Sequence, residues 1–126
     1  MSNVQMEVNI SGIDADAGLK LCDGDFKIYL KSLTLYVANM PANLAKMKNV
    51  SKETLSEYTV AAHGAKSISQ YVGAEEARKT ALQLEMLAKS GDLDGILAHN
   101  EAFIKYAENL LNDVRKWLEK NNISNS

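Results

Sequence analysis

Apolar side chains recur every three or four positions through most of the chain, the spacing of amphipathic helices rather than of strands. One such stripe begins at Phe26 and ends at Met47. Pro41 lies inside it and has no backbone N–H, so we expect a bend there or two helices in near continuity. The stripe consists of Phe26, Leu30, Leu33, Val37, Met40, Leu44 and Met47, with Tyr29 and Tyr36 beside them.

Capping and stop signals divide the first half of the chain. A short helix is predicted over residues 13–22, with Asp14 as its N-cap and the turn at 23–25 as its end. A long helix is predicted from Ser51, a good N-cap, to Val72. It should stop at Gly73, because glycine suits the left-handed position that follows a helix.

The second half follows the same logic. A helix is predicted over residues 74–90. We expect Gly91 to end this helix and Asp92 to be the N-cap of the next one. The last helix should end near residue 120, with a polar tail at 121–126 that frays. The inward positions of these two helices are Ala77, Ala81, Leu84, Leu87 or Ala88, Ile96, Phe103, Ala107, Leu110, Val114 and Trp117, flanked by Leu111 and Leu118.

Four long amphipathic segments joined by short turns predict an all-α fold. We expect an antiparallel up-and-down four-helix bundle with the short N-terminal helix capping one end. At 126 residues the chain is one domain over residues 1–126, with its core at about 12–120. We expect a monomer, because every apolar stripe can be buried within the bundle.

Composition narrows the class of protein. The formal net charge of −2 disfavours non-specific binding to nucleic acid or to an anionic membrane. No apolar run approaches the roughly 20 residues that span a bilayer, and the start MSNVQMEVN lacks the regions of a signal peptide. A single cysteine, Cys22, fits a reducing compartment. We therefore expect a soluble, cytoplasmic protein.

His63 is the main candidate for chemistry. At about 100° per residue, Ser67 and Gln70 fall on its side of the helix, and Ala61 and Ala65 fall opposite. The sequence therefore predicts that His63 faces solvent from the middle of a long helix. Neutral imidazole is a competent nucleophile near pH 7. The residues expected on its side are Ser56, Thr59, Lys66, Ser67 and Gln70, and those expected opposite are Ala61, Ala65, Ile68 and Val72, with Tyr58 beside them.

Simpler interpretations of His63 stand beside this one. An exposed helical histidine is most often merely a surface residue, as His99 is expected to be. A metal site needs further ligands one turn away or on another helix, and no carboxylate shares the His63 stripe. Lys66, one turn on, is expected to offset charge on an incoming phosphoryl group. Residues expected in the core rather than at a redox or cofactor site are Cys22, Trp117, Met40, Met47 and Met86.

The run AHGAKSISQYVGA at residues 62–74 resembles the signature of histidine-containing phosphotransfer (HPt) domains. That signature has a histidine, a lysine three residues on, usually a glycine after it, small residues, and a glycine ten after the histidine. Residues 12–30 are similar to the family's lead-in to its first long helix, and residues 84–92 to the close of the helix after the histidine. The resemblance covers about residues 12–120.

The resemblance implies a phosphorelay protein of a two-component system. His63 would accept the phosphoryl group, Lys66 would assist electrostatically, and Gly73 would permit the tight helix exit. Glu85 is a candidate to orient the ring, and Gln83 a weaker one. Residues on the histidine face with a docking role would be Thr59, Gly64, Ser67 and Gln70.

The implied partners are response-regulator receiver domains and a hybrid sensor histidine kinase. The chain would be a phosphoryl carrier rather than an enzyme, since it lacks G-x-x-x-x-G-K-[ST], a kinase glycine loop and an acidic cluster for Mg²⁺. No cofactor or metal of its own is expected, and Mg²⁺ would belong to the receiver.

Two departures from the family pattern affect partner choice and transfer rate more than activity. Ser67 stands where the family most often has glycine, and Ala65 where a larger aliphatic residue is common. The main rival function is a helical module that binds a receiver or another partner without being phosphorylated. A second rival, a ligand- or metal-binding bundle, predicts polar groups that face inward from several helices.

Overall fold

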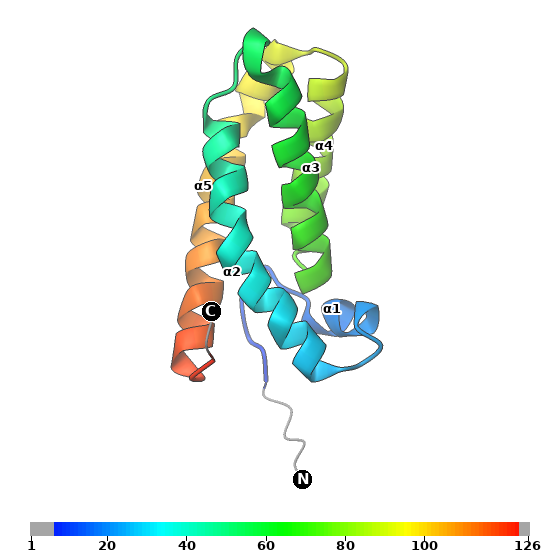
Figure 1. Cartoon of the computed structure of the whole chain (residues 1–126), viewed down its shortest axis with the longest axis vertical. Helices are drawn as coiled ribbons and strands as arrows, with labels where there is room; N and C mark the ends of the chain where they lie inside the picture. Colours follow the sequence, from blue (N-terminus) through cyan, green and yellow to red (C-terminus); the bar gives the residue numbers. More distant parts are fainter. Residues whose placement is uncertain (1–6, 124–126) are drawn as a thin grey trace.

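The computed structural model describes residues 7–123 and is helical through most of that range. No strand occurs between residues 7 and 123, so the predicted all-α class is confirmed. Figure 1 shows the four long helices side by side, with the short helix α1 across one end. The elements are α1 (Ala15–Leu21), α2 (Phe26–Lys48), the 3₁₀ turn η1 (Lys52–Thr54), α3 (Leu55–Val72), α4 (Glu75–Lys89) and α5 (Leu93–Lys120).

The long helices enclose a single core. Helix α2 packs against α3 and α5, and α4 packs against the same two helices, so α3 and α5 lie diagonally across the core. This arrangement is compatible with a four-helix bundle. Within residues 7–123 no helix is both long and apolar enough to cross a membrane. The largest fully buried side chains are Tyr29, Tyr36, Tyr58, Leu33, Met40, Leu44, Met47, Leu84, Ile96 and Leu118.

The predicted helix boundaries agree closely with the structure, with one difference before α3. Asp14 caps α1 by accepting from the backbone N–H of Ala17 at 3.1 Å. Ser51 is also a cap, but its N–H donates to the Thr54 hydroxyl oxygen at 2.8 Å and a 3₁₀ turn comes first. The α-helix therefore begins at Leu55 rather than directly after Ser51.

Pro41 does not divide its helix. α2 runs unbroken from Phe26 to Lys48, so the alternative of two helices is wrong. Figure 1 shows the early turns of α2 leaning across the end of the molecule before the later turns align with α3 and α5. A proline inside a helix commonly bends it, which is the alternative that an unbroken α2 leaves.

Two further expectations concern exposure and the tail. Met40 and Met47 are fully buried and Trp117 nearly so, as predicted, but Met86 is 60% exposed on the outer side of α4. That prediction was wrong because it followed residue type and ignored the angular position of Met86 on its helix. Helix α5 ends at Lys120 as expected, and residues 124–126 of the predicted tail lie outside the described part of the chain.

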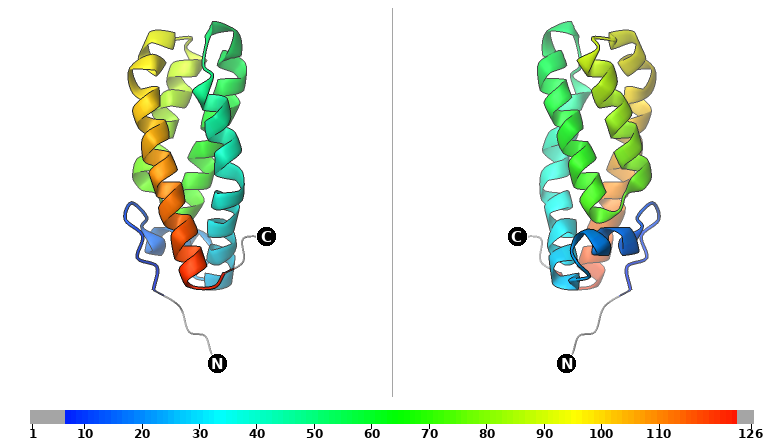
Figure 2. Two further views of the ribbon diagram at one scale, coloured as in Figure 1. Left: turned by 90° about the vertical axis from the view of Figure 1, so that its left-hand side faces the viewer. Right: turned by 90° about the vertical axis from the view of Figure 1, so that its right-hand side faces the viewer.

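Helix α1 closes the end of the molecule where α3 gives way to α4 (Figure 2). The backbone N–H of Asp14 donates to the carbonyl of Gly73 at 2.8 Å. Gly73 adopts a left-handed φ of 81°, and a side chain there would collide with the Asp14 carbonyl. Tyr29 adds a bond from its hydroxyl to the Val72 carbonyl at 2.8 Å. The glycine exit of α3 is therefore the point where α1 and α2 attach.

Candidate functional site

Helix α3 presents His63 to solvent, as its apolar pattern predicts. Tyr58, Ala61 and Ala65 are fully or almost fully buried on the opposite face. The His63 side chain is 57% exposed. Burial of the small apolar face fixes the rotation of the helix about its axis, and this rotation in turn places the imidazole outside.

The imidazole contacts a buried carboxylate from the neighbouring helix. His63 Nδ1 lies 2.9 Å from Oε2 of Glu85 on α4, a hydrogen-bond distance. Glu85 itself is only 2% exposed. The structure therefore brings together His63 and Glu85, and it does so at Nδ1 rather than Nε2.

Two lysines neutralise this carboxylate. Lys66 Nζ, from α3, lies 2.9 Å from Glu85 Oε1, and Lys89 Nζ, one turn on along α4, lies 3.2 Å from Oε2. Burial by itself raises the pKa of the Glu85 carboxyl. The hydrogen bonds from Lys66, His63 and Lys89 outweigh that effect and lower this pKa to about 2.

The charge of Glu85 determines which tautomer the neutral imidazole adopts. An ionised carboxylate can only accept hydrogen bonds, so the proton of the His63 ring must sit on Nδ1 and be donated to Oε2. Nε2 then holds the lone pair. Because the side chain is more than half exposed, this nucleophilic nitrogen can be reached from outside.

Lys89 is the member of this cluster that the sequence prediction missed. It stands four residues after Glu85 on the same helix, a spacing that places two side chains on one face and favours an ion pair. The spacing was visible in the sequence. Its importance was not, because Glu85 becomes the centre of the cluster only when α3 and α4 are packed together.

The residues predicted to dock a partner fall into different environments. The Thr59 hydroxyl donates to the Leu55 carbonyl at 2.7 Å, so it turns back onto its own helix. Gly64 lies under Asn43 of α2, whose Nδ2 and Oδ1 atoms would be 3.1 Å from a methyl group at that position. Ser67 is partly buried and Gln70 is exposed.

Exposed apolar residues lie beside His63 on the same helix. Val60, three residues before it, is 69% exposed, and Tyr71, eight residues after it, is 57% exposed. These two side chains are apolar surface of α3 that the core does not bury. Gln83, the weaker ring-orienting candidate, is exposed and borders Lys79 and Met86 on the outer side of α4.

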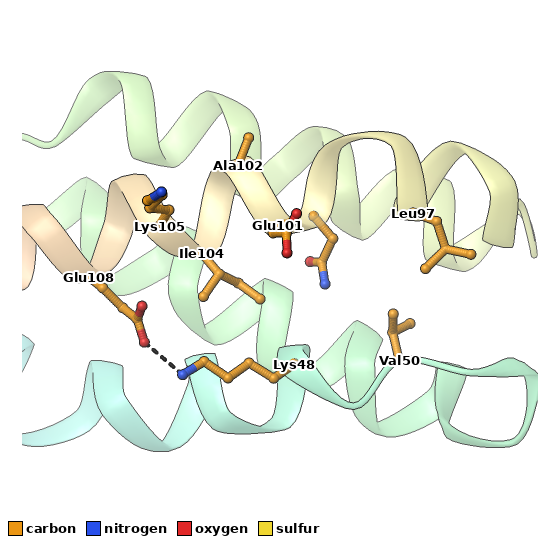
Figure 3. Close-up of a pocket in the computed structure, with 9 residues that line it drawn as sticks. Lys48, Val50, Leu97, Glu101, Ala102, Ile104, Lys105 and Glu108 are labelled. Atoms are coloured by element: carbon orange, nitrogen blue, oxygen red, sulfur yellow. Dashed lines mark ion pairs between the residues drawn. The ribbon is translucent and has the colours of Figure 1, made fainter.

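A concave surface lies between the end of α2 and α5 (Figure 3). It is an open groove of about 780 Å³, whose lining includes Val50, Leu97 and Ile104. Lys48 crosses its edge and pairs with Glu108 at 2.7 Å. No histidine or cysteine lines this groove, and α5 is diagonal to α3, so the groove and His63 belong to different faces.

Within residues 7–123 no three His, Cys, Asp or Glu side chains gather as a set of metal ligands. Comparison of the chain with protein-family models, with curated proteins and with solved structures finds no match.

Proposed function

We propose that this chain is a histidine phosphotransfer protein of the HPt type, which carries a phosphoryl group on His63 Nε2 between aspartates of receiver domains. The observation that carries the proposal is the hydrogen bond between His63 Nδ1 and the buried, ionised Glu85. It holds the ring in the tautomer whose free lone pair faces solvent. A histidine that is merely a surface residue has no need of a buried carboxylate partner.

The chemistry follows from this geometry. In the forward step the Nε2 lone pair forms a bond to phosphorus as the bond between phosphorus and the aspartyl oxygen of the receiver breaks. The carboxylate leaves with the electron pair, and positive charge develops on the imidazole. The proton stays at Nδ1, where the Glu85 carboxylate 2.9 Å away stabilises that charge. The reverse step uses the same groups.

The partner completes the site. The receiver would provide the aspartyl phosphate and Mg²⁺, and this chain would provide the nucleophile on a rigid helix. Val60, one turn before His63, and Tyr71, about two turns after it, are exposed apolar side chains of α3 that another domain could contact. Together with Ser67 they are better docking candidates than Thr59 and Gly64, which face their own molecule.

The same proposal includes the finer description of the fold. The long helices are joined by connections of only two to six residues. Connections this short favour antiparallel neighbours, so successive helices run in opposite directions. An antiparallel up-and-down four-helix bundle with α1 closing one end has this property.

Transfer from a phosphorylated receiver domain, in the presence of Mg²⁺, tests the function directly. The parent protein should acquire label that is acid-labile, and the His63→Gln variant should acquire none. His99→Gln is the matched control, because His99 is an exposed histidine on α5. This control should label as the parent does.

The rival interaction module makes the opposite prediction. If receivers bind the parent but never label it, and His63→Gln binds them equally well, the phosphotransfer proposal must give way to a binding role.

A further inference from the structure

Lys66 and Lys89 approach the same carboxylate but not the same oxygen. Lys66 is paired with Glu85 Oε1 at 2.9 Å. Lys89 is paired at 3.2 Å with Oε2, the oxygen that also accepts from His63 Nδ1. Lys89 Nζ and His63 Nδ1 therefore share one carboxylate oxygen.

The consequences of moving each lysine differ. Oε1 is buried, and among the described residues Lys66 is the one cation paired with it, so the Lys66 charge is what compensates this oxygen. Moving Lys66 away would leave a buried charged oxygen uncompensated, which is costly. Oε2, by contrast, keeps the His63 donor when Lys89 leaves.

Lys66 is also less exposed than Lys89. The Lys66 side chain is 21% exposed and the Lys89 side chain 63% exposed. An ion pair of an exposed lysine contributes little to stability, so Lys89 can change partner at small cost. Lys66 is held in place, whereas Lys89 is free to follow charge that appears at the ring.

We propose that Lys89, rather than Lys66, is the cation that contacts the phosphoryl group on His63, while Lys66 positions Glu85. This inference rests on His63 being phosphorylated, as proposed above. A phosphoryl group on Nε2 brings negative charge to the solvent side of the ring, where an exposed ammonium neutralises it. Lys66, which occupies the motif position, thus has a positioning role, and Lys89 has the catalytic role.

A small phosphoramidate donor tests this without any receiver domain. The Nε2 lone pair attacks its phosphorus, the bond from phosphorus to the amide nitrogen breaks, and ammonia leaves. The rate of phosphorylation and the ³¹P chemical shift of phospho-His63 are then measured for Lys89→Met, Lys66→Met and Lys89→Arg. Lys79→Met is the control, because it removes the same charge from an exposed position on the same helix.

We expect Lys89→Met to lower the initial rate about fivefold and to move the ³¹P resonance, since one charge-assisted contact at an exposed site is lost. Lys89→Arg should restore both, and Lys79→Met should match the parent. The proposal is wrong if Lys89→Met matches Lys79→Met, or if Lys66→Met alone moves the ³¹P resonance. A parent that phosphoramidate labels but receivers do not would overturn the relay function and leave the assignment of the lysines standing.

Discussion

The two faces of α3 bear two polar clusters of opposite character. On the inner face, the Tyr58 hydroxyl donates to Asn100 Oδ1 at 2.6 Å, and Asn100 Nδ2 donates to the Met47 carbonyl at 2.9 Å. These bonds connect α3, α5 and α2 through neutral groups that are almost fully buried. On the outer face, His63 and Glu85 belong to a charged cluster that reaches solvent.

The two clusters differ in whether all of their hydrogen-bonding atoms have partners inside the protein. In the inner cluster the hydroxyl and the amide find partners inside the protein, and such a satisfied network holds helices in a fixed relation. In the outer cluster the Glu85 carboxylate accepts from His63 Nδ1, so in the neutral imidazole Nε2 carries the lone pair and has no partner in the cluster. Removing a member of the inner cluster should therefore affect stability, and removing a member of the outer cluster should affect chemistry.

Asn100→Ala should have the largest effect on stability. It removes the partner of both the Tyr58 hydroxyl and the Met47 carbonyl, and it opens a cavity. We expect a loss of about 3 kcal/mol in the free energy of unfolding, measured by urea denaturation. The folded fraction should still accept phosphoryl label at the parental rate. A slower rate in fully folded protein would show that the two clusters are coupled.

The second prediction concerns pH and Glu85. The pKa of this carboxyl is about 2 in the folded protein against an ordinary value of 4.5. A depressed pKa means that its contribution to stability is complete above about pH 4.5 and is lost as the pH falls towards 2. The stability of the parent relative to Glu85→Gln should therefore drop by about 2 kcal/mol across this range.

Denaturation of both proteins at pH 6, 4 and 3 checks this prediction. Other carboxyls titrate equally in the two chains and cancel in the difference. A constant difference across these pH values would mean that Glu85 is not held ionised by its neighbours.

The third prediction separates two properties of Glu85. Glu85→Gln keeps an oxygen that can accept from His63 Nδ1 but loses the charge, whereas Glu85→Met loses both. We expect the rate of phosphorylation to fall about threefold in the first variant and about tenfold in the second. Nitrogen-15 NMR of the ring should show a mixture of tautomers in Glu85→Met.

Glu108→Gln is the matched control for that series, since Glu108 belongs to an exposed ion pair with Lys48 on another face. It should leave the rate of phosphorylation and the His63 tautomer unchanged. Equal losses in Glu108→Gln and Glu85→Met would show that net charge, and not the bond to Nδ1, sets the rate.

The smallest effect is expected at Gly64, between the two clusters. Alanine favours the helix by about 1 kcal/mol over glycine, but the added methyl would crowd the Asn43 amide at 3.1 Å. Gly64→Ala should therefore change stability by less than 0.5 kcal/mol, roughly. In an Asn43→Ala background the same change should stabilise by about 1 kcal/mol. A double-mutant cycle measures the difference, and additive effects would contradict the contact.

Features that lie on one helix could be predicted from the sequence. Residue spacing predicted the helices, the caps at Asp14 and Asp92, and the outward position of His63. Features that need two helices could not be worked out from spacing. Lys89 at Glu85 Oε2 and Asn43 over Gly64 depend on the rotation of one helix relative to another, which no single stripe determines. Glu85 beside His63 was expected only through the resemblance.

The bond between the Asp14 N–H and the Gly73 carbonyl has a consequence for the order of folding. It joins residues 59 positions apart, and the loop between them contains α1, α2 and α3. Closing so long a loop is entropically expensive unless α2 and α3 have already paired. Seven residues do not form a stable helix alone in water. Helix α1 should therefore be the last element to form and the first to be released, and the helices that present His63 should outlast it.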